Sequence, residues 1–489
     1  MIRESDAIPV TSLFSGHKST LLKISPIHPI FLSTHFENQS TFKGMKIKLL
    51  SATLLLGAFW ATAYAQTLDK AKLDQFFDRL SEKNKAMGSL IIAKDGNVLY
   101  ARSIGYSQIN ATEKKPLTAA NRFRIGSITK MFTAAMILQL VEEGKLKLTD
   151  TLDKFFPQVP NARKITIEQL LWHRSGIPNV RREQNAQENV NTIPVTKDEI
   201  LALIVKTTPD FEPDTRHSYS NSGYQLLGLI LEKVSGKSYG EALTERITAK
   251  IGLANTYLAT GAIDVSKAEA LTYMNFGNGW KPVRETHPSI LFSAGAIIST
   301  PNDLTKFIQA LFDGKIVSTA SLDQMKTIRD GEGSGMEPFT FVGKTFYGHT
   351  GGADNYGAWV AYQPGEKLAV AYTTNAKVYP VANIMNGIMD IYYNKPFTIP
   401  TLESIAVKPE VLDKYVGAYS FPGAPAKFMI TRDGETLYAQ PPGQSAVPLE
   451  ATAENKFQIE GVLIIEFDMA KNQMIIKRRG GERVFTKEN

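Results

Sequence analysis

The chain has 489 residues, of which 43% are hydrophobic and 21% are charged. This composition predicts a folded protein of two or three domains, and it argues against a disordered chain or a protein with many membrane spans. The formal net charge of +7 is small for this length, so we expect no nucleic-acid partner. Cysteine is absent, which excludes disulfides, thiolate nucleophiles and zinc sites with cysteine ligands.

The N-terminal region has the order of a secretory signal. Two lysines precede an apolar run over residues 49–60, and Ala63-Tyr64-Ala65 closes it. We therefore predict a cleaved signal peptide over residues 45–65, with translation starting at Met45 and residues 1–44 as a mis-assigned upstream extension. The mature protein is then exported, periplasmic or secreted, and keeps no membrane span. The alternative is an uncleaved anchor, for which the run is short.

The first half of the remaining chain predicts a hairpin, a helix and a loop. Residues 88–101 read as two apolar strands around an Asp95-Gly96 turn. Apolar residues at helical spacing over 132–143, stopping at Gly144, predict a buried helix. The polar segment 181–194 predicts a loop over a site.

The second half adds another hairpin over residues 356–375 and a helix over 381–392. Strands at both ends with helices between them predict an α+β fold, in which an antiparallel sheet is flanked by helices and carries an inserted helical region. We place this domain at residues 66–394 and a linker at 395–404. A small all-β barrel domain should follow over residues 405–489.

The barrel is predicted from short β patterns rather than from a motif. Apolar segments of strand length lie at residues 428–430, 437–439, 462–467 and 474–477, and an Asp433-Gly434 turn separates the first two. Short strands of this number are typical of a little barrel or sandwich.

Ser127 and Lys130 form a Ser-x-x-Lys motif at the start of the predicted buried helix. Residues at i and i+3 lie on one helix face, so the lysine amine can reach the serine oxygen and activate it as a nucleophile. Residues 15–18 and 40–43 also fit this motif. Both fall in the predicted leader segment, whereas Ser127 has companions further along the chain.

The first companion is Tyr219-Ser220-Asn221, in a serine-rich polar loop before an apolar helical segment over residues 226–234. A phenol can serve as a base if nearby cations lower its pKa, and an amide can bind a substrate carbonyl. The same Tyr-x-Asn spacing also occurs at Tyr273 and Tyr392, so this motif alone is a weak signal.

The second companion is His349-Thr350-Gly351, a string that occurs once and is followed by Gly352. Glycines beside a strand let a substrate backbone approach closely. The ordered set of three motifs is therefore more specific than any one of them.

The order Ser-x-x-Lys, Tyr-x-Asn, His-Thr-Gly resembles the serine β-lactamase-like family. This family contains class C β-lactamases, D,D-peptidases of the penicillin-binding protein type, D-aminopeptidases and related esterases. Residues 170–178 resemble its Leu-Leu-x-His-x-Ser-Gly-Leu/Ile-Pro signature, and residues 293–304 resemble a further family segment. The resemblance covers residues 72–393 and implies a β-lactamase/transpeptidase-like fold, while residues 412–419 look like the opening of a lipocalin-like barrel.

The resemblance also implies roles for the motif residues. Ser127 would attack a carbonyl and form an acyl-enzyme, while Lys130 and Tyr219 share the proton transfers. Asn221, with His349, Thr350 and Gly351, would bind the substrate. The backbone N–H groups of Ser127 and Gly352 would form the oxyanion hole.

His349 departs from the class C β-lactamases, which usually carry lysine there. A neutral imidazole supplies no permanent cation for the carboxylate of β-lactams and D-Ala-terminated peptides. We therefore expect a D,D-peptidase, D-aminopeptidase or esterase that acts on a small-molecule or peptide substrate, including cell-wall-derived ones. The alternatives are a class C β-lactamase and a non-catalytic peptidoglycan-binding or sensor protein. No metal or cofactor is expected, since histidines are scattered.

Overall fold

The computed structural model describes residues 68–180, 192–275, 279–421, 427–442, 446–459, 463–478 and 481–488. The predicted upstream extension, the signal peptide and most of the predicted loop over 181–194 lie outside these residues. Within the described ranges, no helix is both long enough and apolar enough to cross a membrane.

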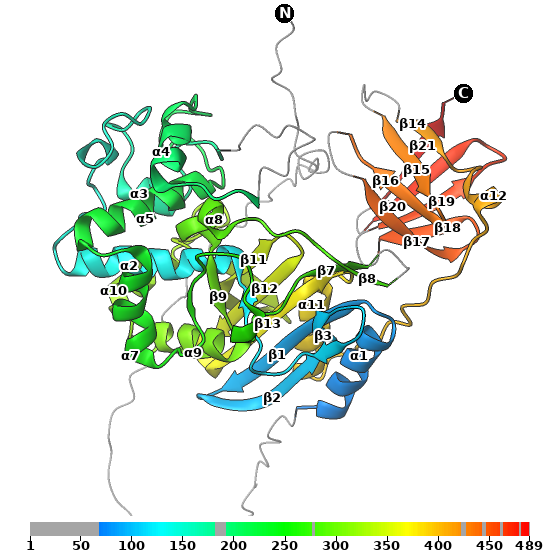
Figure 1. Ribbon diagram of the computed structural model, residues 1–489, viewed down its shortest axis with the longest axis horizontal. Coiled ribbons are helices and arrows are strands. Elements are labelled where there is room, and N and C mark those ends of the chain that lie inside the picture. The colour runs from blue at the N-terminus through cyan, green and yellow to red at the C-terminus, as the bar shows by residue number, and fades with distance from the viewer. Residues whose placement is uncertain are drawn as a thin grey trace, which may run out of the picture. The chain divides into compact units, whose positions relative to one another are not determined.

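The centre of the region before the C-terminal barrel is a six-stranded antiparallel sheet (Figure 1) in the order β10-β11-β12-β13-β1-β2. Its strands are β1 (Ala86–Lys94), β2 (Asn97–Ile104), β10 (Glu337–Phe341), β11 (Lys344–Ala353), β12 (Tyr356–Gln363) and β13 (Leu368–Lys377). The β1–β2 and β12–β13 pairs are the two predicted hairpins. Asp95 and Gly96 have φ angles of 50° and 80°, as a tight hairpin turn requires.

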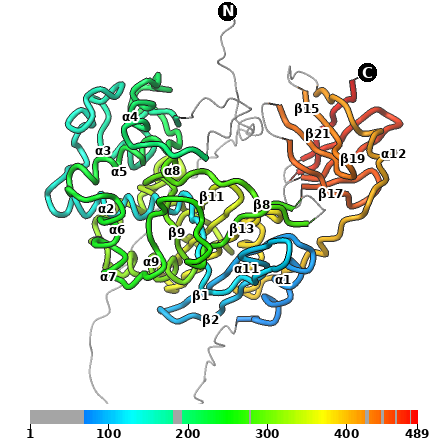
Figure 2. The backbone as a smooth tube through the Cα atoms, in the orientation of Figure 1, coloured from blue at the N-terminus to red at the C-terminus, as the bar shows by residue number. Residues whose placement is uncertain are grey.

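The two hairpins come from distant parts of the chain and meet where β1 pairs with β13, with Ser89 opposite Thr373. Figure 2 shows this meeting in the backbone trace. Leu90 and Ile92 pack with one hydrophobic cluster and Ile91 and Ala93 with another, because successive side chains of a strand point to opposite faces. The continuous apolar run of β1 therefore serves a sheet that is covered on both faces, and the predicted α+β arrangement is confirmed.

One face of the sheet is covered by the helices at the two ends of this region. These are α1 (Lys70–Glu82) and α11 (Val381–Tyr392); Phe76 and Ile388 belong to the same hydrophobic cluster as Leu90 and Val370. The helix predicted over 381–392 is confirmed with those bounds.

The other face carries the inserted helical region. Its helices are α2 (Thr129–Glu142), α3 (Ile167–Leu171), α4 (Lys197–Val205), α5 (Asn221–Ser235), α6 (Tyr239–Leu243), α7 (Ala249–Ile251), α8 (Pro288–Gly295), α9 (Pro301–Phe312) and α10 (Thr319–Lys326). Short strands accompany them: β3 (Tyr106–Ile109), β4 (Lys114–Pro116), β5 (Phe123–Arg124), β6 (Tyr257–Leu258), β7 (Tyr273–Asn275), β8 (Trp280–Pro282) and β9 (Ile297–Ser299). Helix α2 is buried along nearly its whole length, so the predicted buried helix is confirmed, although it starts three residues earlier, at Thr129.

The C-terminal part is a closed antiparallel barrel that follows the short helix α12 (Pro409–Leu412). Its strands are β14 (Gly417–Ser420), β15 (Phe428–Asp433), β16 (Thr436–Gln440), β17 (Val447–Ala453), β18 (Lys456–Ile459), β19 (Leu463–Asp468), β20 (Gln473–Arg478) and β21 (Gly481–Lys487). Pairing of β14 with β21 closes it. Alternate residues such as Ile465 and Phe467 fill the interior, as expected for a barrel of this size.

Candidate active site

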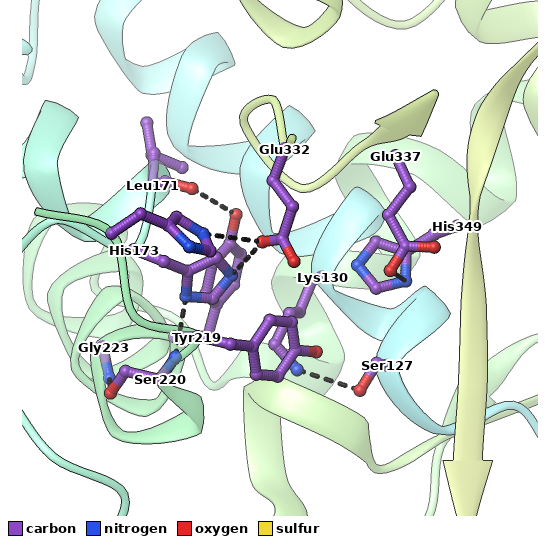
Figure 3. Close-up of polar contacts among 12 residues, drawn as sticks. Ser127, Lys130, Leu171, His173, Tyr219, Ser220, Gly223, Glu332, Glu337 and His349 are labelled. Carbon is purple, nitrogen blue, oxygen red and sulfur yellow. Dashed lines mark hydrogen bonds and ion pairs between the residues drawn. The ribbon is translucent and has the colours of Figure 1, made fainter. Parts of the chain in front are cut away.

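The Ser-x-x-Lys motif lies where a single 3-10 turn, Gly126–Ile128, leads into α2. The amine Nζ of Lys130 lies 3.1 Å from the hydroxyl Oγ of Ser127 (Figure 3). The expected reach of the lysine to the serine is therefore confirmed, even though Ser127 precedes the first α-helical residue.

Lys130 is fully buried, and its amine has two further polar partners. It donates to Oδ1 of Asn221 at 2.8 Å and to the backbone carbonyl of Ala294 at 2.9 Å. Both oxygens can only accept hydrogen bonds. When the amine is neutral it has two N–H groups and one lone pair; if Asn221 and Ala294 take both N–H groups, the lone pair is free to accept from the hydroxyl of Ser127.

The electrostatic environment makes the neutral form of this amine accessible near physiological pH. Burial lowers the pKa of Lys130 to about 7, although the charges of Glu332 and Glu337 oppose that shift. A base that must take the proton of a serine needs a pKa close to the working pH. Lys130 therefore has both the geometry and the basicity to accept it.

Tyr219 lies over the same amine, with its ring centroid 4.7 Å from Nζ of Lys130. Burial raises the pKa of the Tyr219 phenol above its ordinary value, and an interaction with Ser127 offsets only part of the rise. The condition under which Tyr219 could act as a base, a pKa lowered by nearby cations, is not met, because burial is the largest influence and the charges of Glu332 and Glu337 raise the pKa further. The phenol stays protonated and can donate a hydrogen bond toward Ser127.

His173 holds the backbone around Tyr219. Its carbonyl accepts the N–H of Ser218 at 2.9 Å, and its ring nitrogen Nδ1 accepts the N–H of Ser220 at 3.0 Å. The imidazole also stacks on the Tyr219 ring with centroids 4.4 Å apart. Burial lowers the pKa of His173 well below its ordinary value, so the ring is neutral; its remaining proton sits on Nε2, which lies 3.6 Å from Glu332.

The side chain of Asn179 binds the same backbone segment as His173. Its Nδ2 donates to the carbonyl of Tyr219 at 3.0 Å, and its Oδ1 accepts the N–H of Asn221 at 2.6 Å. Residues 173–179 thus take up four backbone groups of residues 218–221. Sequence analysis noted His173 only within a signature segment and missed Asn179, since neither residue carries a recognisable chemical motif by itself.

Strand β11 approaches Ser127 from the opposite side, and glycine allows the approach. A Cβ atom on Gly351 would lie 1.9 Å from the carbonyl of Ile125, and one on Gly126 would lie 2.5 Å from the nitrogen of Gly352. No side chain fits at either position. The backbones of Ser127 and Gly352 are therefore brought together, as an oxyanion hole requires.

The remaining residues of the third motif are engaged inside the protein. His349 is 2% exposed, and its Nδ1 donates to the carbonyl of Thr350 at 2.5 Å. The N–H and hydroxyl of Thr350 donate to Glu337 Oε2 at 3.0 and 3.1 Å. Sequence analysis missed Glu337 and Glu332; the glycine-rich stretch around Glu332, residues 331–335, was the available signal of a close approach.

Glu332 also lies 3.3 Å from Nε2 of His217. Across the part of the chain that is described, no three His, Cys, Asp or Glu side chains are grouped so as to hold a metal ion.

A partly exposed serine beside a buried lysine at the start of a central helix, between an antiparallel sheet and a helical region, defines a serine hydrolase of the penicillin-binding protein and β-lactamase type. The family described as Beta-lactamase matches residues 73–389. The chain belongs to this family, and the protein is a serine hydrolase of that superfamily.

Relatives and solved structures agree with this assignment. A penicillin-binding protein of Bacillus subtilis is 27% identical over 82% of this chain and 94% of its own length. The D-alanyl-D-alanine-carboxypeptidase/endopeptidase AmpH of Escherichia coli is 26% identical over 57% of this chain and 73% of its own.

Two solved structures share the fold. The D-amino acid amidase of Ochrobactrum anthropi, crystallised with D-phenylalanine, is 25% identical with a TM-score of 0.59, covering 66% of this chain and 99% of its own. The octameric penicillin-binding protein homologue of Pyrococcus abyssi is 27% identical with a TM-score of 0.60, covering 86% of this chain and 100% of its own.

Proposed function

We propose that the protein is an exported hydrolase that cleaves an amide or ester carbonyl through an acyl-enzyme on Ser127, with D,D-peptidase, D-aminopeptidase or esterase activity. The observation that carries the proposal is the Lys130 amine, whose two acceptor partners leave its lone pair for the Ser127 hydroxyl. The relatives named above include a carboxypeptidase/endopeptidase and a D-amino acid amidase, which supports this range of substrates.

The proposed reaction has two halves. Lys130 takes the proton of Ser127 as its oxygen attacks the carbonyl, and the N–H groups of Ser127 and Gly352 stabilise the oxyanion. The protonated phenol of Tyr219 relays a proton to the leaving group as the bond to it breaks. Asn221 accepts from Lys130 through Oδ1, so its NH2 group serves to bind a substrate carbonyl. A water molecule then hydrolyses the acyl-enzyme.

One rate panel on purified protein tests the activity. It covers short-chain p-nitrophenyl esters, D-amino-acid amides, a D-Ala-D-Ala peptide and a chromogenic cephalosporin, each with wild type and Ser127→Ala. We expect turnover of an ester, amide or peptide that the Ser127→Ala variant loses. Fast cephalosporin hydrolysis would favour the class C β-lactamase alternative instead.

A fluorophosphonate probe tests whether the serine reacts at all. We expect stoichiometric labelling of wild type and none of Ser127→Ala. Equal labelling of both, or no labelling and no turnover of any substrate, would favour the non-catalytic binding or sensor protein.

Export is a separate part of the proposal, and it rests on the charged, apolar and Ala-x-Ala order of residues 45–65. N-terminal sequencing of the natively expressed mature protein should find a start just after residue 65. Retention of Met1 in the mature protein would contradict both the cleavage and the assignment of residues 1–44 as an upstream extension. The same proposal assigns residues 66–394 to the catalytic domain, 395–404 to a linker and 405–489 to the lipocalin-like barrel.

A further inference from the structure

The carboxylate of Glu337, from strand β10, lies at the edge of β11 next to Ser127. Strand β10 begins at Glu337, opposite Gly348, so β10 pairs with β11 only as far as Gly348. Beyond that point the N–H groups of Thr350 and Gly352 leave the same edge of the strand, since alternate residues share a direction. The N–H of Gly352 lies beside the Ser127 turn, whereas the N–H of Thr350 donates to Glu337.

Glu337 accepts both hydrogen bonds that Thr350 donates and lies close to the ring of His349. Its Oε2 accepts from both the N–H and the hydroxyl of Thr350, and its Oε1 lies 3.7 Å from Nδ1 of His349. That Nδ1 already donates to the carbonyl of Thr350. The N–H and hydroxyl of Thr350 are the donors to which a substrate carboxylate would bind, and the carboxylate of Glu337 already accepts their hydrogen bonds.

The charge of this carboxylate is not cancelled by a strong cation. In the described ranges, the basic side chains within ion-pair distance of Glu337 and Glu332 are histidines alone. The nearby imidazoles of His349 and His173 are driven toward the neutral form, chiefly by burial. Glu337 lies beside His349 (Figure 3) and keeps a 20% exposed side chain, so its charge is also partly open to solvent.

We propose that Glu337 occupies the anion position of this site, so that the protein accepts leaving groups that are neutral or cationic and rejects those that carry a carboxylate. The inference rests on the proposed acyl-enzyme function and narrows its substrates to esters, amides and amine-bearing leaving groups. It disfavours D-Ala-terminated peptides and β-lactams, whose carboxylate would meet Glu337 in place of a donor.

Three esters of one acyl group test the proposal. The acyl group is the one turned over fastest in the panel above, and the leaving alcohols are glycolate, glycolamide and choline, with charges of −1, 0 and +1. Each kcat/KM is divided by the hydroxide-catalysed rate of the same ester to remove differences in intrinsic reactivity. We expect wild type to prefer glycolamide over glycolate by roughly ten- to a hundredfold, the size of one close charge repulsion near a protein surface, and to accept choline at least as well as glycolamide.

Glu337→Gln should lower the glycolamide-to-glycolate ratio by about tenfold or more, as expected for removal of that repulsion. Glu332→Gln is the matched control, because it removes a neighbouring carboxylate that bonds to no donor of the third motif; its effect on the ratio should be clearly smaller. Thermal melts of both variants check folding. The wild-type ratio tests the proposal even if a variant does not fold.

The outcomes separate the two proposals. If wild type hydrolyses the glycolamide ester through Ser127 but shows a ratio near one or below, the charge inference fails and the proposed hydrolase stands. If Glu332→Gln shifts the ratio as much as Glu337→Gln, the effect is a general field and the assignment to Glu337 is overturned. Absence of Ser127-dependent turnover on every substrate overturns the hydrolase itself.

Discussion

Two groups of residues flank Ser127, a helix-side wall and a strand-side wall, and different interactions hold each of them in place. The helix-side wall, residues 173–179 and 218–221, is held by hydrogen bonds between backbone groups and two neutral side chains, those of the buried His173 and the exposed Asn179. The strand-side wall, Glu337 with residues 349–352, is held by the close packing of glycine backbones and by one carboxylate. In the proposed reaction the first wall positions the groups that transfer protons, and the second affects which shapes and charges of substrate the site accepts.

Two carboxylates near Lys130 influence its pKa. The charges of Glu332 and Glu337 both oppose the loss of the charge of the amine. The difference between the walls predicts different consequences when each is altered.

The largest effect should come from removing the amine itself. Lys130→Met should lower kcat/KM by about 10³-fold or more, near the upper range for loss of a general base. In wild type, kcat/KM should rise through pH of about 7 and level off above it, because Lys130 is a base only when it is deprotonated. The residual activity of the variant should lack this inflection. A wild-type rate that instead falls as pH rises past 7 would contradict the role of Lys130.

Adding a methyl group to the strand-side wall should disrupt its close backbone packing. Gly351→Ala forces a Cβ to within 1.9 Å of the Ile125 carbonyl, so we expect kcat/KM to fall by about 10²–10³-fold, as for loss of an oxyanion donor. Overpacking should also cost about 1–3 kcal/mol of unfolding free energy. Gly352→Ala is the matched comparison, since its nearest neighbour would be Lys377 Nζ at 3.8 Å. Equal losses in both variants would show that close packing at Gly351 is not what shapes this wall.

The helix-side wall should respond more mildly, through Tyr219. His173→Ala removes the acceptor for the Ser220 N–H and the ring under Tyr219, so kcat should fall about 10²-fold, the cost of a misplaced catalytic group, with a smaller change in KM. His173→Asn keeps an acceptor near the position of Nδ1 and should recover part of the rate. If both variants lose only stability and keep the wild-type kcat, the positioning role is refuted.

Much of the fold follows from local sequence patterns. The hairpins β1–β2 and β12–β13 and the helices α2 and α11 were predicted because their apolar periodicity and turn residues are strong and local. In the barrel, strands such as β14 and β21 were not predicted. They are short and weakly patterned, and only their mutual pairing closes the barrel.

The sequence by itself identified the candidate residues of the site. Three ordered motifs name Ser127, Lys130 and Tyr219, since a nucleophile needs a base at a spacing that one helix turn can supply. It could not determine protonation, because the lowered pKa of Lys130 and the raised pKa of Tyr219 depend on burial created by distant segments. Nor could it reveal Glu337, which meets Thr350 only because β10 pairs with β11. The spacing of the motifs can be read along the chain. The burial of the site residues and the charges around them depend on segments that only folding brings together.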